Sequence, residues 1–376
     1  MKRIGLNTDR GRHAAWLELF FDLAYVVALT RLTHIVVEGH DGNVGVGDYL
    51  SYFVLFVPVW WSWVGHTMYQ NRFGVYDLTD SLLTLLQMFF AMMLAFGISD
   101  AFGASAPIFA LAYAATRWIL IFMYMRVHIS NQEVRPVTGG LATGFGAGSF
   151  LWGVSVLFPA PIMYGFWVAG IMIELATPLL LRKPLSRAPV HNTHLPERVG
   201  LFALLVIGES FLGIVSGADH YKLSFTAFIN LFFAFSIICA IWWVYFETLE
   251  KALNGNLKGA AHLCIYGHLP IYMGIGLLAA GVKKLVAMNY SVTEVNLIFL
   301  FSLLLILLPL QMIHYKYTNH KEGRLVFWRG VLMLVSIFVF VYSPAFVSES
   351  VFAFLVVAIL LAYIQLAPVF GEQEIR

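Results

Sequence analysis

Long apolar stretches separated by short polar connections dominate the pattern of this chain. A transmembrane helix needs about 20 mostly apolar residues, and twelve stretches of the 376-residue chain meet this requirement. The pattern predicts an all-α fold, a polytopic helical membrane protein with about twelve transmembrane helices. The predicted spans cover residues 16–37, 49–69, 81–99, 106–127, 140–158, 162–181, 197–217, 225–247, 260–281, 294–314, 326–343 and 349–367.

The composition agrees with this pattern. Hydrophobic residues make up 60% of the chain and charged residues 12%, with a mean hydropathy of +0.79, whereas an ordinary soluble domain carries about 25% charged residues. Residues 1–13 are basic and precede an apolar run, as in a secretory signal. Glu18 and Asp22 interrupt this run, however, and no A-x-A cleavage site follows it. We therefore expect an uncleaved first span.

Lysine and arginine residues fall mainly on one side of the predicted membrane. Of the 23, three (Lys222, Lys283 and Lys284) lie on the opposite side and two (Arg31 and Arg117) lie inside spans. Because cytoplasmic loops carry an excess of Lys and Arg, both termini are predicted to be cytoplasmic. The 18 residues on the cytoplasmic side are Lys2, Arg3, Arg10, Arg12, Arg72, Arg126, Arg135, Arg182, Lys183, Arg187, Arg198, Lys251, Lys258, Lys316, Lys321, Arg324, Arg329 and Arg376.

The two halves of the chain show signs of a duplication. The second predicted span ends with Trp60-Trp61 and the eighth with Trp242-Trp243, and the first and seventh each open with a histidine followed by a glutamate. Six spans per half is an even number, so the halves would share one orientation. We predict two parallel six-helix repeats, residues 1–186 and 187–376, although tryptophan belts also recur at membrane interfaces.

Two acids lie on one face of the first predicted span. Glu18 and Asp22 are four residues apart and therefore share a helix face. An ionisable group at bilayer depth costs roughly 2.5–3.5 kcal/mol and often marks a site, and the repulsion between the two acids favours a proton-exchanging pair. Asp22 lies deeper, so we favour a functional role for it. Glu18 lies in the first turn, where the helix dipole stabilises an acid and a structural role fits better.

Glu209 is the strongest single candidate for binding an ion, because it lies deep in the seventh span between the small residues Gly208 and Ser210. Glu174 lies similarly deep in the sixth span, and Arg117 lies near the middle of the fourth. An unpaired cation at that depth is expensive, so we expect one of the two acids to neutralise Arg117. An Arg117–Glu174 pair would be structural and would leave Glu209 for function.

Histidines and one further acid complete the set of candidates. His66 ends the second span and His268 lies inside the ninth, where an imidazole with a pKa of about 6.5 could relay protons. A lone histidine in a helix is more often simply hydrogen-bonded. Glu247 is a further candidate for binding the substrate or ion. No H-E-x-x-H, E-x-x-H or C-x-x-C spacing occurs in any span. A metal held by His66, His268 and Glu209 would therefore need ligands from different helices, and the cofactor stays unknown.

Four sequence blocks are distinctive. They are WLELFFDLAYVVAL at residues 16–29, WWSWVGHTMYQNRF at 60–73, HLPERVGLFALLVIGES at 194–210 and WWVYFE at 242–247. At these residues the chain resembles the bacterial low temperature requirement protein A family. The resemblance implies a multi-span bacterial membrane protein named for a cold-growth phenotype, and it carries over no biochemical activity. The positions typical of the family are Glu18, Phe21, Asp22, Trp61, Arg72, His194, Glu197, Arg198, Gly208, Glu209 and Glu247.

Three classes of function fit these residues. We favour a proton- or ion-linked transporter or channel that uses buried carboxylates between the two halves and takes a small ion or small-molecule substrate. The alternatives are an intramembrane enzyme or metal-binding protein acting on a lipid or apolar substrate, and a structural or sensory membrane protein. The sequence leans away from an enzyme, since it contains no phosphate-binding glycine-rich loop and no G-x-S-x-G motif. We expect a multi-pass protein of the bacterial cytoplasmic (inner) membrane, with the lipid bilayer and no nucleic acid as partner, and leave oligomer formation open.

Overall fold

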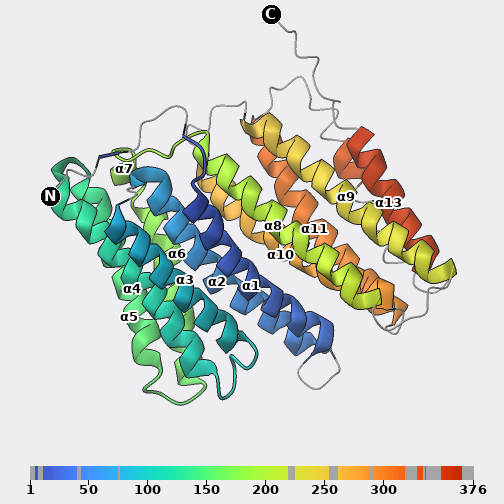
Figure 1. Ribbon diagram of the computed structural model, residues 1–376, viewed down its shortest axis with the longest axis horizontal. Coiled ribbons are helices and arrows are strands. Elements are labelled where there is room, and N and C mark those ends of the chain that lie inside the picture. Colours follow the sequence, from blue (N-terminus) through green and yellow to red (C-terminus); the bar gives the residue numbers. More distant parts are fainter. Residues whose placement is uncertain are drawn as a thin grey trace, which may run out of the picture. The chain divides into compact units, whose positions relative to one another are not determined.

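The structure is a computed structural model that describes residues 5–6, 12–39, 44–74, 77–218, 225–253, 261–287, 291–317, 328–332, 335 and 349–365. These residues form helices joined by loops, with no strand among them, so the fold is all-α as predicted (Figure 1). The helices are α1 (Trp16–Glu38), α2 (Val46–Phe73), α3 (Leu78–Ile98), α4 (Ala106–Ser130), the 3-10 helix η1 (Gln132–Val134), α5 (Arg135–Ser155), α6 (Ile162–Leu180), α7 (Arg182–Leu185), α8 (His194–Ala218), α9 (Phe225–Leu253), α10 (Ala261–Ala287), α11 (Val292–Tyr317) and α13 (Glu349–Gln365).

Eleven of the twelve predicted spans coincide with these helices, and the remaining one, residues 326–343, lies mostly outside the described residues. Among the described residues, eight helices are long and apolar enough to cross a membrane: α1, α3, α4, α6, α8, α9, α10 and α11. The total of twelve, the duplication and the cytoplasmic termini stay predictions.

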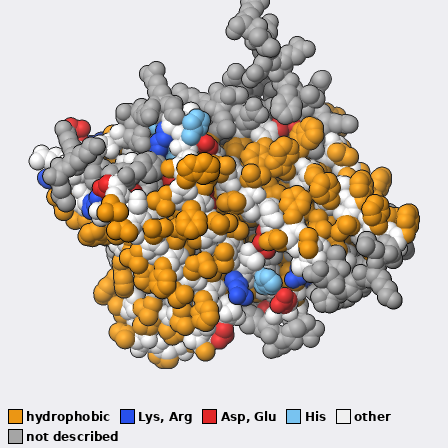
Figure 2. All heavy atoms as spheres, viewed as in Figure 1, with side chains coloured by type: hydrophobic (Ala, Val, Ile, Leu, Met, Phe, Trp, Pro, Cys, Tyr) orange, Lys and Arg blue, Asp and Glu red, His pale blue; other side chains and the backbone are white. Residues whose placement is uncertain are grey.

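The surface of the helices is apolar. Large hydrophobic side chains such as Leu82, Phe96 and Phe232 are more than half exposed, and Figure 2 shows hydrophobic side chains over most of the described surface on the face drawn. A soluble monomer rarely exposes contiguous apolar surface on this scale. Helices that expose this much apolar surface fit contact with lipid.

Contacts within the chain divide it into two compact units. Unit 1 comprises Met1–Ile35 and Tyr49–Arg198, and unit 2 comprises Val36–Asp48 and Val199–Arg376. The first turn of α8 therefore belongs to unit 1 and the rest of that helix to unit 2.

In unit 1, helices α3, α4, α5 and α6 pack in succession. Small residues allow α5 and α6 to approach closely: a Cβ placed on Gly148 would lie 2.7 Å from the carbonyl oxygen of Gly170. Gly144 faces Thr177 in the same way. The glycines of α5 thus serve helix packing, which membrane helices achieve with small interfacial residues.

In unit 2, α10 packs along α11 and α9 packs against α13. An ion pair between Lys284 and Glu294 joins the ends of α10 and α11. Gly274 allows α10 and α11 to approach, since a Cβ there would lie 2.8 Å from the carbonyl oxygen of Ser302. Pro270 lies inside α10, which continues as a helix on both sides of it.

Candidate functional site

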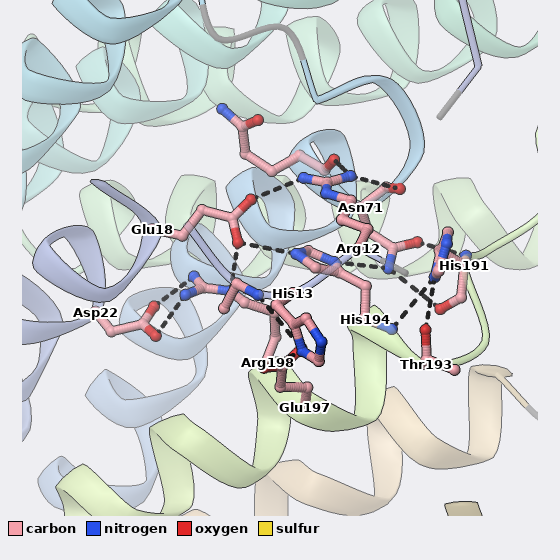
Figure 3. A network of polar contacts seen from close by, with 12 residues as sticks. Arg12, His13, Glu18, Asp22, Asn71, His191, Thr193, His194, Glu197 and Arg198 are labelled. Atoms are coloured by element: carbon pink, nitrogen blue, oxygen red, sulfur yellow. Dashed lines mark hydrogen bonds and ion pairs between the residues drawn. The ribbon is translucent and has the colours of Figure 1, made fainter. Parts of the chain in front are cut away.

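A buried network of charged side chains forms in unit 1 where α1 meets the first turn of α8 (Figure 3). Glu18 and Asp22 lie one turn apart on α1, and His194 and Arg198 lie one turn apart on α8. Glu18 binds His194 and Asp22 binds Arg198, and in both pairs the partners are 176 positions apart. A constant separation means that the two helices run parallel here. All four side chains are buried, with residue exposures of 0% or 1%.

Asp22 forms the deepest part of this network. The Arg198 guanidinium donates two hydrogen bonds to its carboxylate, Nη1 to Oδ2 at 2.8 Å and Nη2 to Oδ1 at 2.6 Å. The indole Nε1 of Trp63, on α2, donates to Oδ1 at 2.7 Å. Both oxygens of a fully buried carboxylate therefore accept charge-assisted or indole hydrogen bonds, which is the arrangement that a low-dielectric site requires.

Glu18 holds the outer part of the network. Arg12 Nη2 donates to its Oε1 at 2.8 Å, and His194 Nε2 lies 2.8 Å from its Oε2. Arg198 Nε lies 3.6 Å from the same Oε2, so this arginine links the two acids. Two carboxylates and two guanidiniums balance, and the repulsion expected between Glu18 and Asp22 is offset by the two arginines.

The last turn of α2 fastens this network to the segment that precedes α8. Arg12 Nη1 donates to the carbonyl oxygen of Gln70 at 2.7 Å, and Arg72 Nε donates to that of Ala188 at 3.0 Å.

Asn71 Nδ2 lies 3.1 Å from His194 Nδ1, and the backbone N–H of His191 donates to Asn71 Oδ1 at 2.9 Å. The segment Ala188–His194 is thus held by side chains of α2.

Asp80, in the first turn of α3, accepts hydrogen bonds from Tyr69 at 3.2 Å and from the side chain of Gln70 at 2.8 Å. Asp77 caps α3 by accepting from the backbone N–H of Asp80 and also binds Arg126 Nη2 at 2.6 Å. Burial would raise the pKa of Asp77, but the backbone N–H and the guanidinium together lower it below its ordinary value. These contacts join the ends of α2, α3 and α4.

A second group of polar side chains lies among α1, α2 and α4 and is also buried. Tyr25 bonds Ser62 at 2.8 Å, and Ser62 donates to Thr116 at 2.8 Å. Gln87 donates to the carbonyl oxygen of Thr116 at 2.9 Å. These hydrogen bonds link α1, α2, α3 and α4 inside the helix bundle.

The structure brings Arg117 and Glu174 together. Arg117 Nε lies 2.7 Å from Glu174 Oε2, both side chains are fully buried, and Tyr113 donates its hydroxyl to the same oxygen at 2.8 Å. Arg117 also donates to the carbonyl oxygen of Trp61 at 3.3 Å and lies over the ring of Phe145, 4.4 Å from its centroid. The acid that neutralises Arg117, which the sequence left open between Glu174 and Glu209, is therefore Glu174.

The remaining candidates are His66 in unit 1 and His268, Glu209 and Glu247 in unit 2. His66 is fully buried in α2 and stacks on Phe21, with ring centroids 3.9 Å apart. In unit 2, the Tyr245 hydroxyl lies 3.0 Å from His268 Nε2. Glu209, on α8, and Glu247, on α9, are also buried in unit 2. Among the residues that the structure describes, no three His, Cys, Asp or Glu side chains are grouped to hold a metal ion.

Sequence reasoning missed Arg12, Arg198, His194 and Asn71 as members of the network. The sequence places Arg198 on the cytoplasmic side, at the start of the seventh predicted span, and indicates no partner for it, whereas in the structure it is buried against Asp22. One signal could have found it: a pair of acids spaced by four residues on one helix, matched by a basic pair with the same spacing on another.

The chain is similar to known proteins over most of its length. The family model described as "Bacterial low temperature requirement A protein (LtrA)" matches residues 13–364. An uncharacterized protein of Rhizobium meliloti (strain 1021), RA0937, is 27% identical over 316 residues, which cover 77% of this chain and 73% of the relative. No solved structure matches this chain.

Proposed function

We infer the function from two premises. The chain belongs to the bacterial low temperature requirement A protein (LtrA) family, and the described part of it contains eight apolar helices long enough to span a bilayer, so it is an integral, multi-pass membrane protein. We propose that it is a proton- or ion-linked transporter or channel of the bacterial cytoplasmic membrane. Its substrate would be a small ion or molecule, and the acids Asp22, Glu18 and Glu209 would bind it or exchange protons.

The observation that carries this proposal is the buried charged network on α1 and α8. Ionisable groups within membrane helices are costly, and they commonly mark ion pathways and proton relays. Here two acids, two arginines and a histidine share one interior site. Helix packing alone needs no such concentration of charge, since small residues and single polar contacts hold membrane helices together.

The network is closed in this conformation. Asp22 is fully buried and both its oxygens are occupied by Arg198 and Trp63. An ion or proton would therefore reach Asp22 only after Arg198 moves away. On this proposal the Asp22–Arg198 pair is a gate that opens during the transport cycle.

Proteoliposomes loaded with a pH-sensitive dye would test the proposal under imposed gradients of candidate ions. Wild type is expected to change the internal pH, and Asp22→Asn and Glu209→Gln should each abolish this change. The Glu209→Gln variant should still be expressed at nearly the wild-type level. Glu133→Gln, at an exposed position between α4 and α5, is the matched control and should transport normally. Equal traces for wild type and empty liposomes across the ions tested would contradict the proposal.

A structural or sensory role is the second candidate, favoured by the complete burial of Asp22 against protein partners. The double variant Asp22→Asn/Arg198→Gln separates the two roles, because it removes both charges and leaves neither stranded. A folded double variant without flux supports transport. A folded double variant with wild-type flux assigns the pair to helix packing.

A further inference from the structure

The side-chain amide of Asn71 has a fixed orientation. Its Oδ1 accepts from the backbone N–H of His191 at 2.9 Å, and its Nδ2 donates to the carbonyl oxygen of His191 at 3.4 Å. A backbone N–H can only donate and a carbonyl can only accept, so the amide cannot be turned around without losing both bonds. The Nδ2 donor therefore points to His194 Nδ1, 3.1 Å away.

This orientation fixes the protonation of His194. Because Asn71 presents a donor, His194 Nδ1 has to accept, and the ring is neutral with its proton on Nε2. That Nε2–H donates to Glu18 Oε2 at 2.8 Å. A histidine beside a carboxylate ordinarily gains a second proton, and Asn71 opposes this gain at the other ring nitrogen.

We propose that His194 is a proton-binding site of the network, and that Asn71 is the positioning residue that couples its protonation to the segment preceding α8. A second proton, taken from water, would bind Nδ1 of His194. The new N–H donor would then face the Nδ2 donor of Asn71. The contact is relieved only when Asn71 releases His191, so proton uptake detaches the His191 backbone from Asn71, while Arg72 still holds the carbonyl oxygen of Ala188. The network then carries one positive charge instead of none.

The charged groups around His194 do not decide its protonation by themselves. Glu18 on α1 favours the charged imidazole, while Arg12 and Arg198 oppose it. Burial also disfavours the charged ring, and the Asn71 donor at Nδ1 acts in the same direction.

His191 lies on the same segment and has a similar restriction. The backbone N–H of His194 donates to His191 Nδ1 at 3.3 Å, and the hydroxyl of Thr193 lies 3.2 Å from the same nitrogen. A proton on His191 Nδ1 would face a backbone donor, so this ring also accepts in the closed arrangement. A control variant therefore replaces the His191 side chain, so that an effect of the His191 ring can be told apart from an effect of the His194 ring.

This inference deepens the proposed function and rests on it for the role of the proton, but its test does not depend on transport. The full chain, labelled with nitrogen-15 in its 12 histidines and reconstituted in bilayers, would be examined by solid-state NMR. Subtracting the spectrum of His194→Gln assigns the His194 ring. Wild type at neutral pH should show a protonated Nε2 and an unprotonated Nδ1.

Two variants of Asn71 are compared, and both lose the Nδ2 donor that faces His194. Aspartate keeps an oxygen that can accept from the His191 backbone N–H, whereas leucine loses both contacts to His191. Asn71→Asp offers Nδ1 a carboxylate, so the proton affinity of His194 should rise about tenfold or more. Asn71→Leu offers no acceptor and should leave the ring neutral at neutral pH. His191→Asn should leave the His194 signals unchanged.

A doubly protonated or Nδ1-protonated His194 in wild type at neutral pH would overturn the inference, and this result needs no Asn71 variant to fold. Equal His194 spectra for Asn71→Asp and Asn71→Leu would overturn it as well. If the NMR result holds while liposomes show no flux, the transport proposal fails and the proton site stands.

Discussion

Two of the buried acid–arginine pairs in unit 1, Arg117–Glu174 and Asp22–Arg198, differ in what surrounds them. Arg117–Glu174 is enclosed by Tyr113, Phe145 and the backbone of Trp61. Asp22–Arg198 continues through Glu18 and His194 to Asn71 and the segment preceding α8.

The difference shows how one kind of contact can have two roles. An ion pair enclosed by aromatic side chains and backbone holds its helices in place, and changing it alters stability alone. An ion pair that is linked through a titratable ring to a loop can respond to a proton and move that loop. The surroundings of a buried charge therefore indicate its role better than the pair itself.

The largest expected effect is that of Arg117→Ala. The substitution strands the fully buried Glu174 and removes the contact with Phe145, so it should cost about 3–5 kcal/mol of stability. Folded yield, measured by fluorescence-detected size exclusion, should fall sharply. Normal expression of this variant would show that the pair is not structural.

Asp22→Asn and Glu174→Gln compare the two pairs directly. After Asp22→Asn, Arg198 still lies near Glu18, so the loss of stability should be smaller than for Glu174→Gln, which leaves Arg117 without an acid. Flux per folded molecule should behave in the opposite way, lost in Asp22→Asn and kept in Glu174→Gln. Thermal unfolding and liposome flux, measured on the same preparations, would refute the comparison if both variants lost flux equally.

Trp63→Phe tests the indole hydrogen bond to Asp22 and keeps an aromatic ring in place. Losing one hydrogen bond to a buried carboxylate should cost about 1–2 kcal/mol, seen as a lower unfolding temperature. Trp118→Phe, at a half-exposed indole on α4, is the matched control and should change this temperature little. An equal shift in both variants would argue that the indole bond to Asp22 adds no stability.

The smallest effect is expected for Glu197→Gln. Its partner His13 is largely exposed and lies 3.3 Å away, and exposed pairs contribute little. Unfolding temperature and flux should both match wild type. A clear loss of flux would extend the functional network to the surface of unit 1.

Much of the fold could be predicted from the sequence, because hydrophobic length alone defines a membrane helix. Eleven of the twelve predicted spans coincide with helices, and the helix boundaries differ by a few residues. The candidate acids Glu18 and Asp22 were also visible, since a carboxylate stands out in an apolar segment.

The partners of these acids could not be predicted. Arg198 is distant from Asp22 in sequence, and its charge alone placed it among the 18 Lys and Arg residues of the cytoplasmic side. The sequence left Glu174 and Glu209 as equal candidates for the acid that neutralises Arg117, and only the ion pair between α4 and α6 in the structure identified Glu174. Hydrophobic pattern fixes which residues form a helix, but not which neighbour that helix meets.

The amino-acid sequence by itself determined that this chain forms apolar helices of membrane length, because each helix satisfies its own backbone hydrogen bonds within one segment. It also determined that charge lies inside some of them. Only the tertiary structure decided which charges neutralise one another, since pairing depends on the register between α1 and α8 and on how Asn71 is held. Local hydrogen bonding is encoded locally, whereas the role of a buried charge depends on distant parts of the chain.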